Sequence, residues 1–184
     1  MTLRSDVAEL LAGVGIIDVD VDDAVADEHV RSAAYRRVVL VTASSRSRDR
    51  DRAIVATILR DPMEMVSKSA VVDLVDRIAT RATGPAEFRR WSAELLPEID
   101  HLKTEDHREF IRRRIHDWLF YLSIEDGHVP TSVELAKVAD RMQRLLAEKS
   151  TSPAVLALLA ESGSSRKIRN IAKNRAGSRR LRAR

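Results

Sequence analysis

Apolar residues recur at every third or fourth position through most of the chain, a spacing that places them on one face of an α-helix. The strongest stretch follows Thr104-Glu-Asp, a combination typical of a helix start. The expected buried face of this helix consists of Ile111, Ile115, Trp118, Leu119 and Leu122. A second long stretch, 23–44, would direct Val30, Ala34, Val38 and Val41 inward. The pattern therefore predicts a protein built mainly from amphipathic helices.

Capping residues, glycines and prolines divide this pattern into eight or nine helices. The expected helices lie near 5–12, 23–44, 50–60, 62–82, 85–95, 104–127, from 131 or 132 onward, 153–162 and 166–175. Pro97 is expected to bend or restart the chain after the fifth of them. The apolar faces are too wide for a two-stranded coiled coil. We therefore expect an all-α, irregular multi-helix domain, with an α-solenoid as one arrangement that fits.

One segment shows a different period. Residues 17–22 alternate between apolar and acidic side chains, which is typical of a β-strand, and the other strand-like run is 38–41. Since a single pair of strands does not make a stable sheet, we favour an extended linker at 16–21. The alternative is a small α+β domain in which 16–21 pairs with 37–43.

The composition favours a folded protein. Hydrophobic residues make up 44% of the 184 residues and charged residues 33%, which suits one domain, or one domain with a tail. The lack of cysteine excludes disulfides and thiolate metal sites. The first residues do not resemble a signal peptide, and no apolar run approaches a membrane span. We therefore expect a cytoplasmic protein that does not contact a membrane.

Charge is distributed unevenly between the body and the C-terminus. Residues 164–184 contain nine basic residues and no acidic one, whereas residues 1–163 contain 23 basic and 28 acidic residues, a net charge of −5. This predicts a helical domain over 1–163 and a basic segment over 164–184, in which a helix is followed by a disordered tail beyond Ala176. An anionic partner is one interpretation of the segment, and a solvated or self-docked tail is the other.

Two stretches resemble helical-repeat modules of the HEAT or armadillo type. The first is Leu59-Arg-Asp-Pro62 with the apolar positions 66, 70, 71, 74 and 78, and the second runs from Ser152-Pro-Ala-Val-Leu156 through Gly163 to Ile168-Arg-Asn-Ile171. In such repeats, paired helices stack and bury a shared face. The resemblance covers about a quarter of the chain. It implies a binding surface rather than a catalyst, and it transfers no functional residue.

Possible metal ligands occur without a complete pattern. Two Glu-x-x-His motifs, at 98–101 and 125–128, have the spacing of carboxylate-bridged di-iron helices, but a proline disturbs the first and a glycine turn holds the second. The acidic run that starts at Asp18 lacks the glycine and the glutamate that a calcium loop requires. We interpret these histidines, and also His107 and His116, as surface residues, and we expect no cofactor.

Aromatic and arginine residues have structural interpretations. Trp91, Phe110, Trp118, Phe120 and Tyr121 interleave with aliphatic residues at helical spacing, so we expect them in the core, with one of the adjacent pair Phe120 and Tyr121 excepted. The consecutive arginines 112–114 fan around their helix, which suggests a solvated face with one arginine reaching a neighbouring carboxylate.

The basic segment is the best candidate for function. Helix 153–162, the turn 161–165 and helix 166–175 have a helix–turn–helix outline, although its second helix carries Arg169 at a position that is usually apolar. We predict a non-enzymatic protein that binds nucleic acid, DNA or RNA, through this segment. The expected contact residues are Arg166, Lys167, Arg169, Asn170, Lys173, Arg175, Arg179, Arg180, Arg182 and Arg184. The alternative is a helical-repeat interaction module or scaffold whose tail binds an acidic protein surface.

Overall fold

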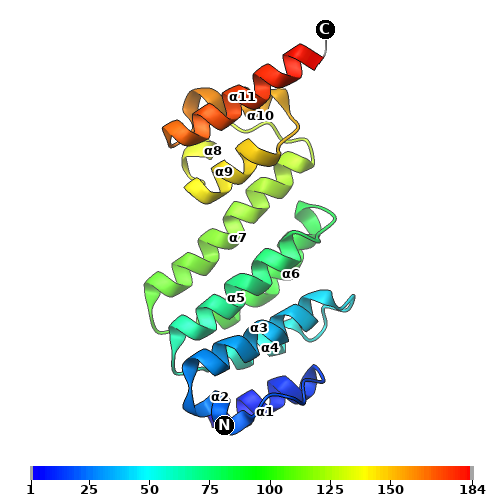
Figure 1. Ribbon diagram of the computed structural model, residues 1–184, viewed down its shortest axis with the longest axis vertical. Coiled ribbons are helices and arrows are strands. Elements are labelled where there is room, and N and C mark those ends of the chain that lie inside the picture. Colours follow the sequence, from blue (N-terminus) through cyan, green and yellow to red (C-terminus); the bar gives the residue numbers. More distant parts are fainter. Residues whose placement is uncertain (1, 183–184) are drawn as a thin grey trace. The chain divides into compact units, whose positions relative to one another are not determined.

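The computed structural model describes residues 2–182, with side chains up to Ser178, and this part of the chain is built from helices and contains no strand (Figure 1). The helices are α1 (Leu3–Gly13), α2 (Val21–Ala26), α3 (Glu28–Ser44), α4 (Asp51–Ile58), α5 (Glu64–Ala79), α6 (Pro85–Ile99), α7 (Glu105–Glu125), α8 (Ser132–Ala136), α9 (Asp140–Lys149), α10 (Pro153–Ser162) and α11 (Arg166–Arg182). The all-α prediction is confirmed. The alternative strand pair is wrong, because residues 37–43 lie inside α3.

The chain divides into two compact units, Met1–Ile115 and His116–Arg184. The first contains α1 to α6 and the first half of α7, and the second contains the rest of α7 and α8 to α11. Within the second unit, α11 packs against α9 and α10. The basic segment is therefore joined to a helical body, and the predicted boundary near residue 163 stays a prediction.

The helix predicted over 23–44 is two helices, because Asp27 interrupts it. Asp27 has extended backbone angles, ends α2 and begins α3, and its carboxylate accepts a hydrogen bond from the backbone N–H of His29 at 2.7 Å. Asp20, in the same acidic run, caps α2 in the same way: its carboxylate accepts hydrogen bonds from the N–H groups of Asp22 and Asp23. These carboxylates satisfy the N–H groups that every helix start leaves unpaired.

The buried face of α3 also differs from the prediction. Ala34 and Val38 are buried, but Val30 and Val41 are 37% and 43% exposed. The buried face of α3 instead includes Arg31, because this residue takes part in a buried ion pair. A charged residue was not expected on an apolar face, which explains the error.

A buried ion pair of Arg31 and Asp61 joins separate elements of the first unit. The Nε of Arg31 donates to Oδ2 of Asp61 at 2.7 Å, and the Tyr35 hydroxyl donates to the same oxygen at 2.9 Å. The other carboxylate oxygen accepts from the N–H of Met63 at 2.8 Å, and Arg31 also donates to the carbonyl of Ala24. Because both carboxylate oxygens of Asp61 accept hydrogen bonds and Arg31 also donates to α2, the network joins α2, α3 and the α4–α5 turn.

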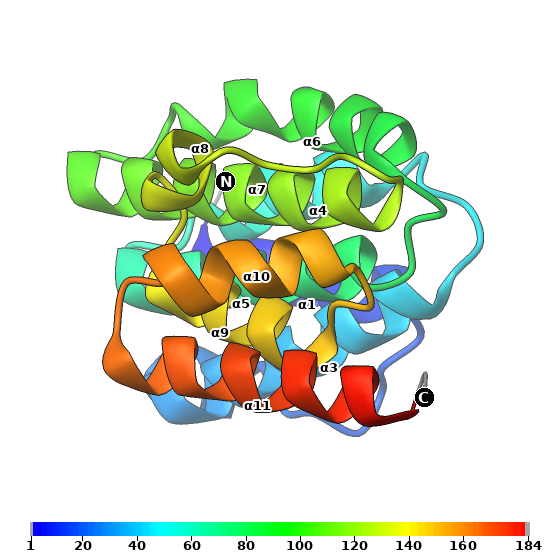
Figure 2. The same ribbon diagram turned by 90° about the horizontal axis from the view of Figure 1, so that it is seen from above.

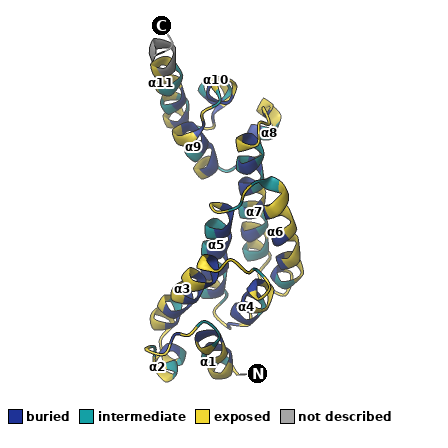
Figure 3. Cartoon of the chain, turned by 90° about the vertical axis from the view of Figure 1, so that its right-hand side faces the viewer, coloured by how far each residue is buried: buried dark blue, intermediate teal, exposed yellow. Residues whose placement is uncertain are grey.

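The apolar face of α7 is confirmed with one exception. Ile111 and Ile115 are buried in the first unit, Trp118 and Leu122 are buried in the second, and Leu119 is half-buried. Figure 3 shows the distribution of buried positions along the helices. Most of the expected aromatic core residues are also buried, but Phe110 is 47% exposed, with the cations of Lys68 and Arg114 near its ring.

Two other helix boundaries differ from expectation. α6 continues through Pro97 to Ile99, whereas the predicted helix ended at residue 95 and the chain was expected to bend or restart at Pro97. The helix expected from residue 131 or 132 onward is divided into α8 and α9, because the carboxylate of Asp117 accepts from the N–H of Ala139 at the start of α9, at 3.3 Å. Arg112 bonds to the carboxylates of Asp100 and Glu109, as expected for one of the three consecutive arginines.

Candidate nucleic-acid interface

Helices α10 and α11 form an antiparallel hairpin (Figure 2). Near the turn, Nη1 of Arg169 donates to the carbonyl of Gly163 at 2.6 Å. Farther along α11, Nη1 of Arg175 donates to the carbonyls of Ala147 and Ser150, both at 3.0 Å. Since Ser150 lies just before the start of α10, these contacts show that α11 runs back alongside α10.

This arrangement corrects the helix–turn–helix outline. Both predicted helices and the turn between them exist, but helices of that motif cross at about 90–120°. In such a crossing, Arg175 would be far from the start of α10. The hairpin instead packs one side of α11 along its partner and leaves the other side open.

The sequence around the turn explains why the two helices pack closely. Ile168 and Ala172 are buried on the inner side of α11, and the hydroxyl of Ser165 accepts from the N–H of Ile168 at 3.3 Å. Gly163 has no room for a side chain, because a Cβ atom there would lie 2.6 Å from the carbonyl oxygen of Leu159 and 2.9 Å from Cγ2 of Ile168. The glycine therefore allows the start of α11 to approach the end of α10.

Two of the predicted contact arginines have structural roles. Arg169 and Arg175 are half-buried, and their guanidinium groups bond to carbonyls at the ends of α10 and α9, where helices leave C=O groups unpaired. A cation at this position also interacts favourably with the negative end of the helix dipole. We therefore separate these two residues from those that are available to a partner.

The available residues form the outer face of α11. Arg166, Asn170 and Lys173 are exposed and follow one another at spacings of four and three residues, so they lie in a row along the helix. Lys167 and Asn174 are also exposed and are seven residues apart, which places them in a second row beside the first. The structure thus brings together five polar side chains, three of them cationic, on a single surface.

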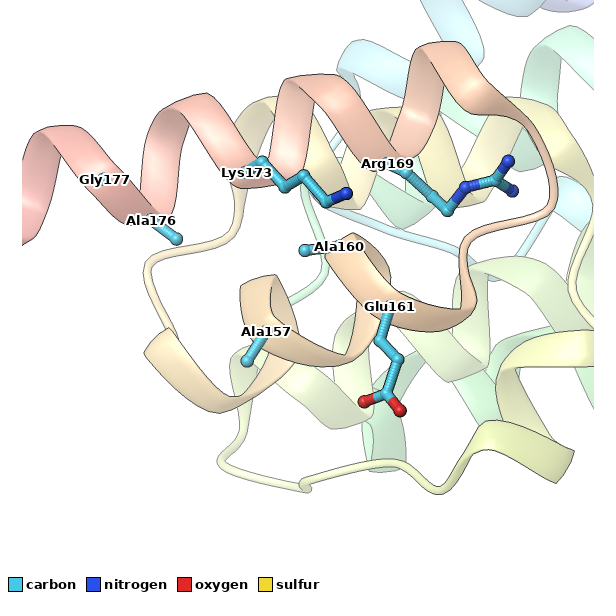
Figure 4. Close-up of a pocket in the computed structure, with 7 residues that line it drawn as sticks. All are labelled: Ala157, Ala160, Glu161, Arg169, Lys173, Ala176 and Gly177. Carbon is cyan, nitrogen blue, oxygen red and sulfur yellow. The ribbon is translucent and has the colours of Figure 1, made fainter.

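A groove of about 600 Å³ lies beside this surface, between α10 and α11. Four small residues line it: Ala157, Ala160, Ala176 and Gly177. Arg169 and Lys173 extend over it from α11, and Glu161 points away from α11 (Figure 4). The groove therefore combines a smooth apolar lining with positive charge on one side.

The acidic residues near the hairpin are few in the described part of the chain. Glu148 on α9 bonds to Arg144 at 2.8 Å. That hydrogen bond, together with the positive charges of Arg144, Lys149 and Lys167, lowers the pKa of Glu148. Glu148 is thus ionised at neutral pH, but it is already paired with Arg144. Among the residues that the structure describes, no carboxylate forms a salt bridge with Arg166 or Lys173 that would compete with an external anion.

The end of α11 corrects a further prediction. The helix continues to Arg182, so the expectation of a disordered chain beyond Ala176 is wrong for residues 177–182. Ala176 and Gly177 line the groove together with Ala157 of α10, and the helix continues for five residues beyond them. At 1.5 Å per residue, the seven residues 176–182 extend the basic helix by about 10 Å. Arg179, Arg180 and Arg182 belong to this extension, and Arg184 lies outside the described residues.

Sequence reasoning missed the residue that joins the hairpin to the rest of the second unit. The side-chain NH₂ of Gln143 donates to the carbonyls of Leu135 and Val138, both at 3.0 Å, and its oxygen accepts from the N–H of Ser164 at 2.9 Å. Gln143 is 2% exposed. A glutamine next to Met142 in an otherwise apolar face was the signal that could have indicated a buried polar role.

The other candidate groups serve local structure. His101 is exposed and 3.6 Å from Glu98, and His128 contacts Glu134 rather than Glu125 of its own motif. Within the residues that the structure describes, no group of three or more histidine or acidic side chains has a metal-binding arrangement. Trp91 is buried and donates from Nε1 to Asp51 at 2.9 Å.

Comparison with known proteins gives no family assignment: no family model, curated protein or solved structure matches the chain. The resemblance to HEAT and armadillo repeats therefore stays a prediction. Among the described helices, none combines the length and the apolar character that crossing a membrane requires.

Proposed function

We propose that this protein binds nucleic acid through the outer face of α11, mainly by contacts to phosphate, and that it acts without a cofactor or a catalytic step. The observation that supports this proposal is the charge of α11. Residues 166–182 contain eight basic residues and no acidic one, while the inner side of the same helix packs in the hairpin. A rigid helix presents its cations at fixed spacing, which lowers the entropy lost when they bind a row of phosphates.

Phosphate contacts account for affinity in such an interface because each neutralised phosphate releases condensed counterions. Arg166, Lys167 and Lys173 supply the charge. Asn170 and Asn174, one helical turn apart, supply amide groups that both donate and accept hydrogen bonds, as contacts to sugar or base edges require. Arg179, Arg180 and Arg182 would extend the same contact along the strand.

Fluorescence anisotropy with labelled duplex DNA, single-stranded DNA and duplex RNA, over a range of salt concentrations, tests the proposal. The triple variant Arg166→Ser, Lys167→Ser, Lys173→Ser should bind more weakly. Its slope of log K against log[salt] should be flatter by about 0.7–0.9 for each phosphate contact that is lost.

The matched control removes the same charge elsewhere. Arg36, Arg89 and Arg90 are exposed on the first unit, and changing all three to serine lowers the net charge equally. If the control weakens binding as much as the α11 variant, the contact is not localised on α11. Absence of binding to all three probes at low salt would overturn the proposal.

A second candidate is an interaction module for an acidic protein segment, and the α10–α11 groove favours it. Its alanine and glycine lining allows close approach of another helix, and Lys173 would face a carboxylate on that helix. Binding to a partner that persists after nuclease treatment and depends little on salt would support this alternative over the first.

A further inference from the structure

The two asparagines of the chain, Asn170 and Asn174, both lie on the outer face of α11 and are exposed. Asparagine favours helix caps and turns over helix interiors, because its side chain bonds to nearby backbone groups there. Within the part of the chain that the structure describes, neither of these side-chain amides has a hydrogen-bond partner. Helix stability therefore does not account for either residue, and both amides are available to a ligand.

The cations of α11 flank these amides on both sides. Lys167 and Lys173 are each three residues from Asn170, so at about 100° per residue they lie about 60° to either side of it around the helix axis. Arg166 is four residues from Asn170, on the same side as Lys173. Asn170 therefore occupies the middle of the outer face, with positive charge along both of its edges.

This arrangement matches the major groove of B-form DNA. The groove is about 12 Å wide and about 8.5 Å deep, and it accepts an α-helix, whose diameter with side chains is about 10–12 Å. Phosphates follow both walls of the groove, and base edges form its floor. A helix with amides along its middle and cations along its edges would meet bases and phosphates in that order.

Other nucleic acids match the outer face less well. The major groove of A-form RNA is deep and so narrow that side chains cannot read its bases. Proteins that bind single strands stack the bases on aromatic side chains, and residues 164–184 contain no aromatic residue. The outer face of α11 therefore favours duplex DNA.

Asparagine pairs with adenine in the major groove, because its amide accepts from N6 of the base and donates to N7. Asn170 and Asn174 are four residues apart, or about 6 Å along the helix, which corresponds to about two base-pair steps. We infer that α11 enters the major groove of duplex DNA and that Asn170 and Asn174 recognise adenines there. This inference rests on the proposed function, to which it adds the kind of nucleic acid and a sequence preference.

Selection from a pool of duplex DNA with a randomised central segment tests the inference. The wild-type protein should enrich sequences that carry adenines about two base pairs apart. Asn170→Ala should abolish the preference at one of these positions, and Asn174→Ala should abolish it at the other. Both residues are exposed, so the variants should fold, which circular dichroism verifies.

The enriched duplex then serves as a fluorescence anisotropy probe in two forms. In the second form, 7-deazaadenine replaces the selected adenines, which removes the N7 acceptor and preserves base pairing. The wild type should bind this form about fivefold or more weakly, and the double variant Asn170→Ala, Asn174→Ala should bind both forms equally. Lys173→Ser should weaken binding to both forms by the same factor, because it removes a phosphate contact. Ser162→Ala, at an exposed position on α10, should match the wild type.

Duplex RNA and single-stranded DNA of the enriched sequence complete the set of probes. Absence of binding to every probe would overturn the proposed function and this inference together. Three results would overturn the inference alone and leave phosphate binding in place: binding without an enriched sequence, a preference that survives both asparagine substitutions, or tighter binding to the RNA duplex or the single strand.

Discussion

The side-chain oxygen of Gln143 accepts a hydrogen bond from the backbone N–H of Ser164 at 2.9 Å, while its NH₂ group donates to two carbonyls at the end of α8. This buried amide therefore links α9 to the helix before it and to the turn that begins α11. The orientation of the basic helix thus depends on a residue that is far from the basic surface.

Replacing Gln143 with methionine should lower the free energy of unfolding by about 1–3 kcal/mol, because it leaves buried backbone groups without partners while keeping a similar side-chain volume. Urea denaturation measures the difference. The neighbouring change Arg144→Met, at an exposed position, should stay within about 0.5 kcal/mol of the wild type. Equal effects of the two changes would show that the Gln143 hydrogen bonds contribute nothing.

Two glycines in the hairpin should respond to alanine in opposite directions. At Gly163, a Cβ atom would lie 2.6 Å from a backbone carbonyl oxygen, so Gly163→Ala should destabilise the protein and displace the start of α11. Gly177 lies inside α11 with open space around it, so Gly177→Ala should stabilise the helix by about 0.5–1 kcal/mol. Thermal denaturation of both variants checks the signs, and two changes of the same sign would contradict the hairpin geometry.

The carboxylate of Glu64 should make stability depend on pH. Hydrogen bonds from the Thr104 side chain and from the N–H groups of Lys103 and Thr104 lower the pKa of Glu64 from 4.5 to about 2. Because the folded state holds the carboxylate ionised, this stabilisation is complete above pH 4.5 and is lost as the pH falls toward 2. Glu64→Gln should lower the melting temperature at neutral pH, and its difference from the wild type should shrink as the pH falls through that range.

The control for this prediction is Glu9→Gln, which changes an exposed carboxylate on α1. Its melting temperature should follow that of the wild type across the same pH range. A Glu64→Gln variant that differs from the wild type by a constant amount at every pH would show that the charge of Glu64 does not stabilise the start of α7.

Substitutions at different positions of α11 should affect either protein stability or nucleic-acid binding. Arg175→Met removes the donors that bond to Ala147 and Ser150, so it should cost about 1–3 kcal/mol of stability. Lys173→Met, at an exposed position, should leave stability within about 0.5 kcal/mol of the wild type but weaken nucleic-acid binding. Urea denaturation and anisotropy on the same two proteins test the separation, and a reversed pattern would exchange the roles of the two residues.

Local signals predicted the two helices and the turn between them, although not their antiparallel packing, because the turn and the caps are encoded by adjacent residues. Ser152-Pro153 determines where α10 begins, Gly163 where it ends and Ser165 where α11 begins, and each acts within one helical turn. The same kind of signal was overlooked at Asp27, where the helical period continues across the break between α2 and α3.

Two other errors concern interactions between residues that are distant in the sequence. The buried ion pair of Arg31 with Asp61 joins positions 30 residues apart, and it turns α3 away from the face that its valines predicted. Likewise, the partners of Arg175 could not be inferred, because they depend on how closely α11 returns along α10. Sequence patterns indicated which residues carry charge, but packing decides which of those charges are free.

The final prediction concerns the extension of α11 beyond the hairpin. Replacing Arg179, Arg180, Arg182 and Arg184 with serine should weaken nucleic-acid binding and flatten its salt dependence by about 0.7–0.9 in log–log slope for each phosphate contact that is lost. The melting temperature should not change if these residues serve only an external partner. If the segment instead binds the acidic body of the protein, whose residues 1–163 carry a net charge of −5, the same substitutions should change stability at low salt and leave binding unaltered. Measuring anisotropy and melting temperature at the same low and high salt concentrations distinguishes the two outcomes. If the segment docks on the body, salt screening lowers the stability of the protein. If the segment contacts phosphate, salt screening lowers only the affinity for nucleic acid.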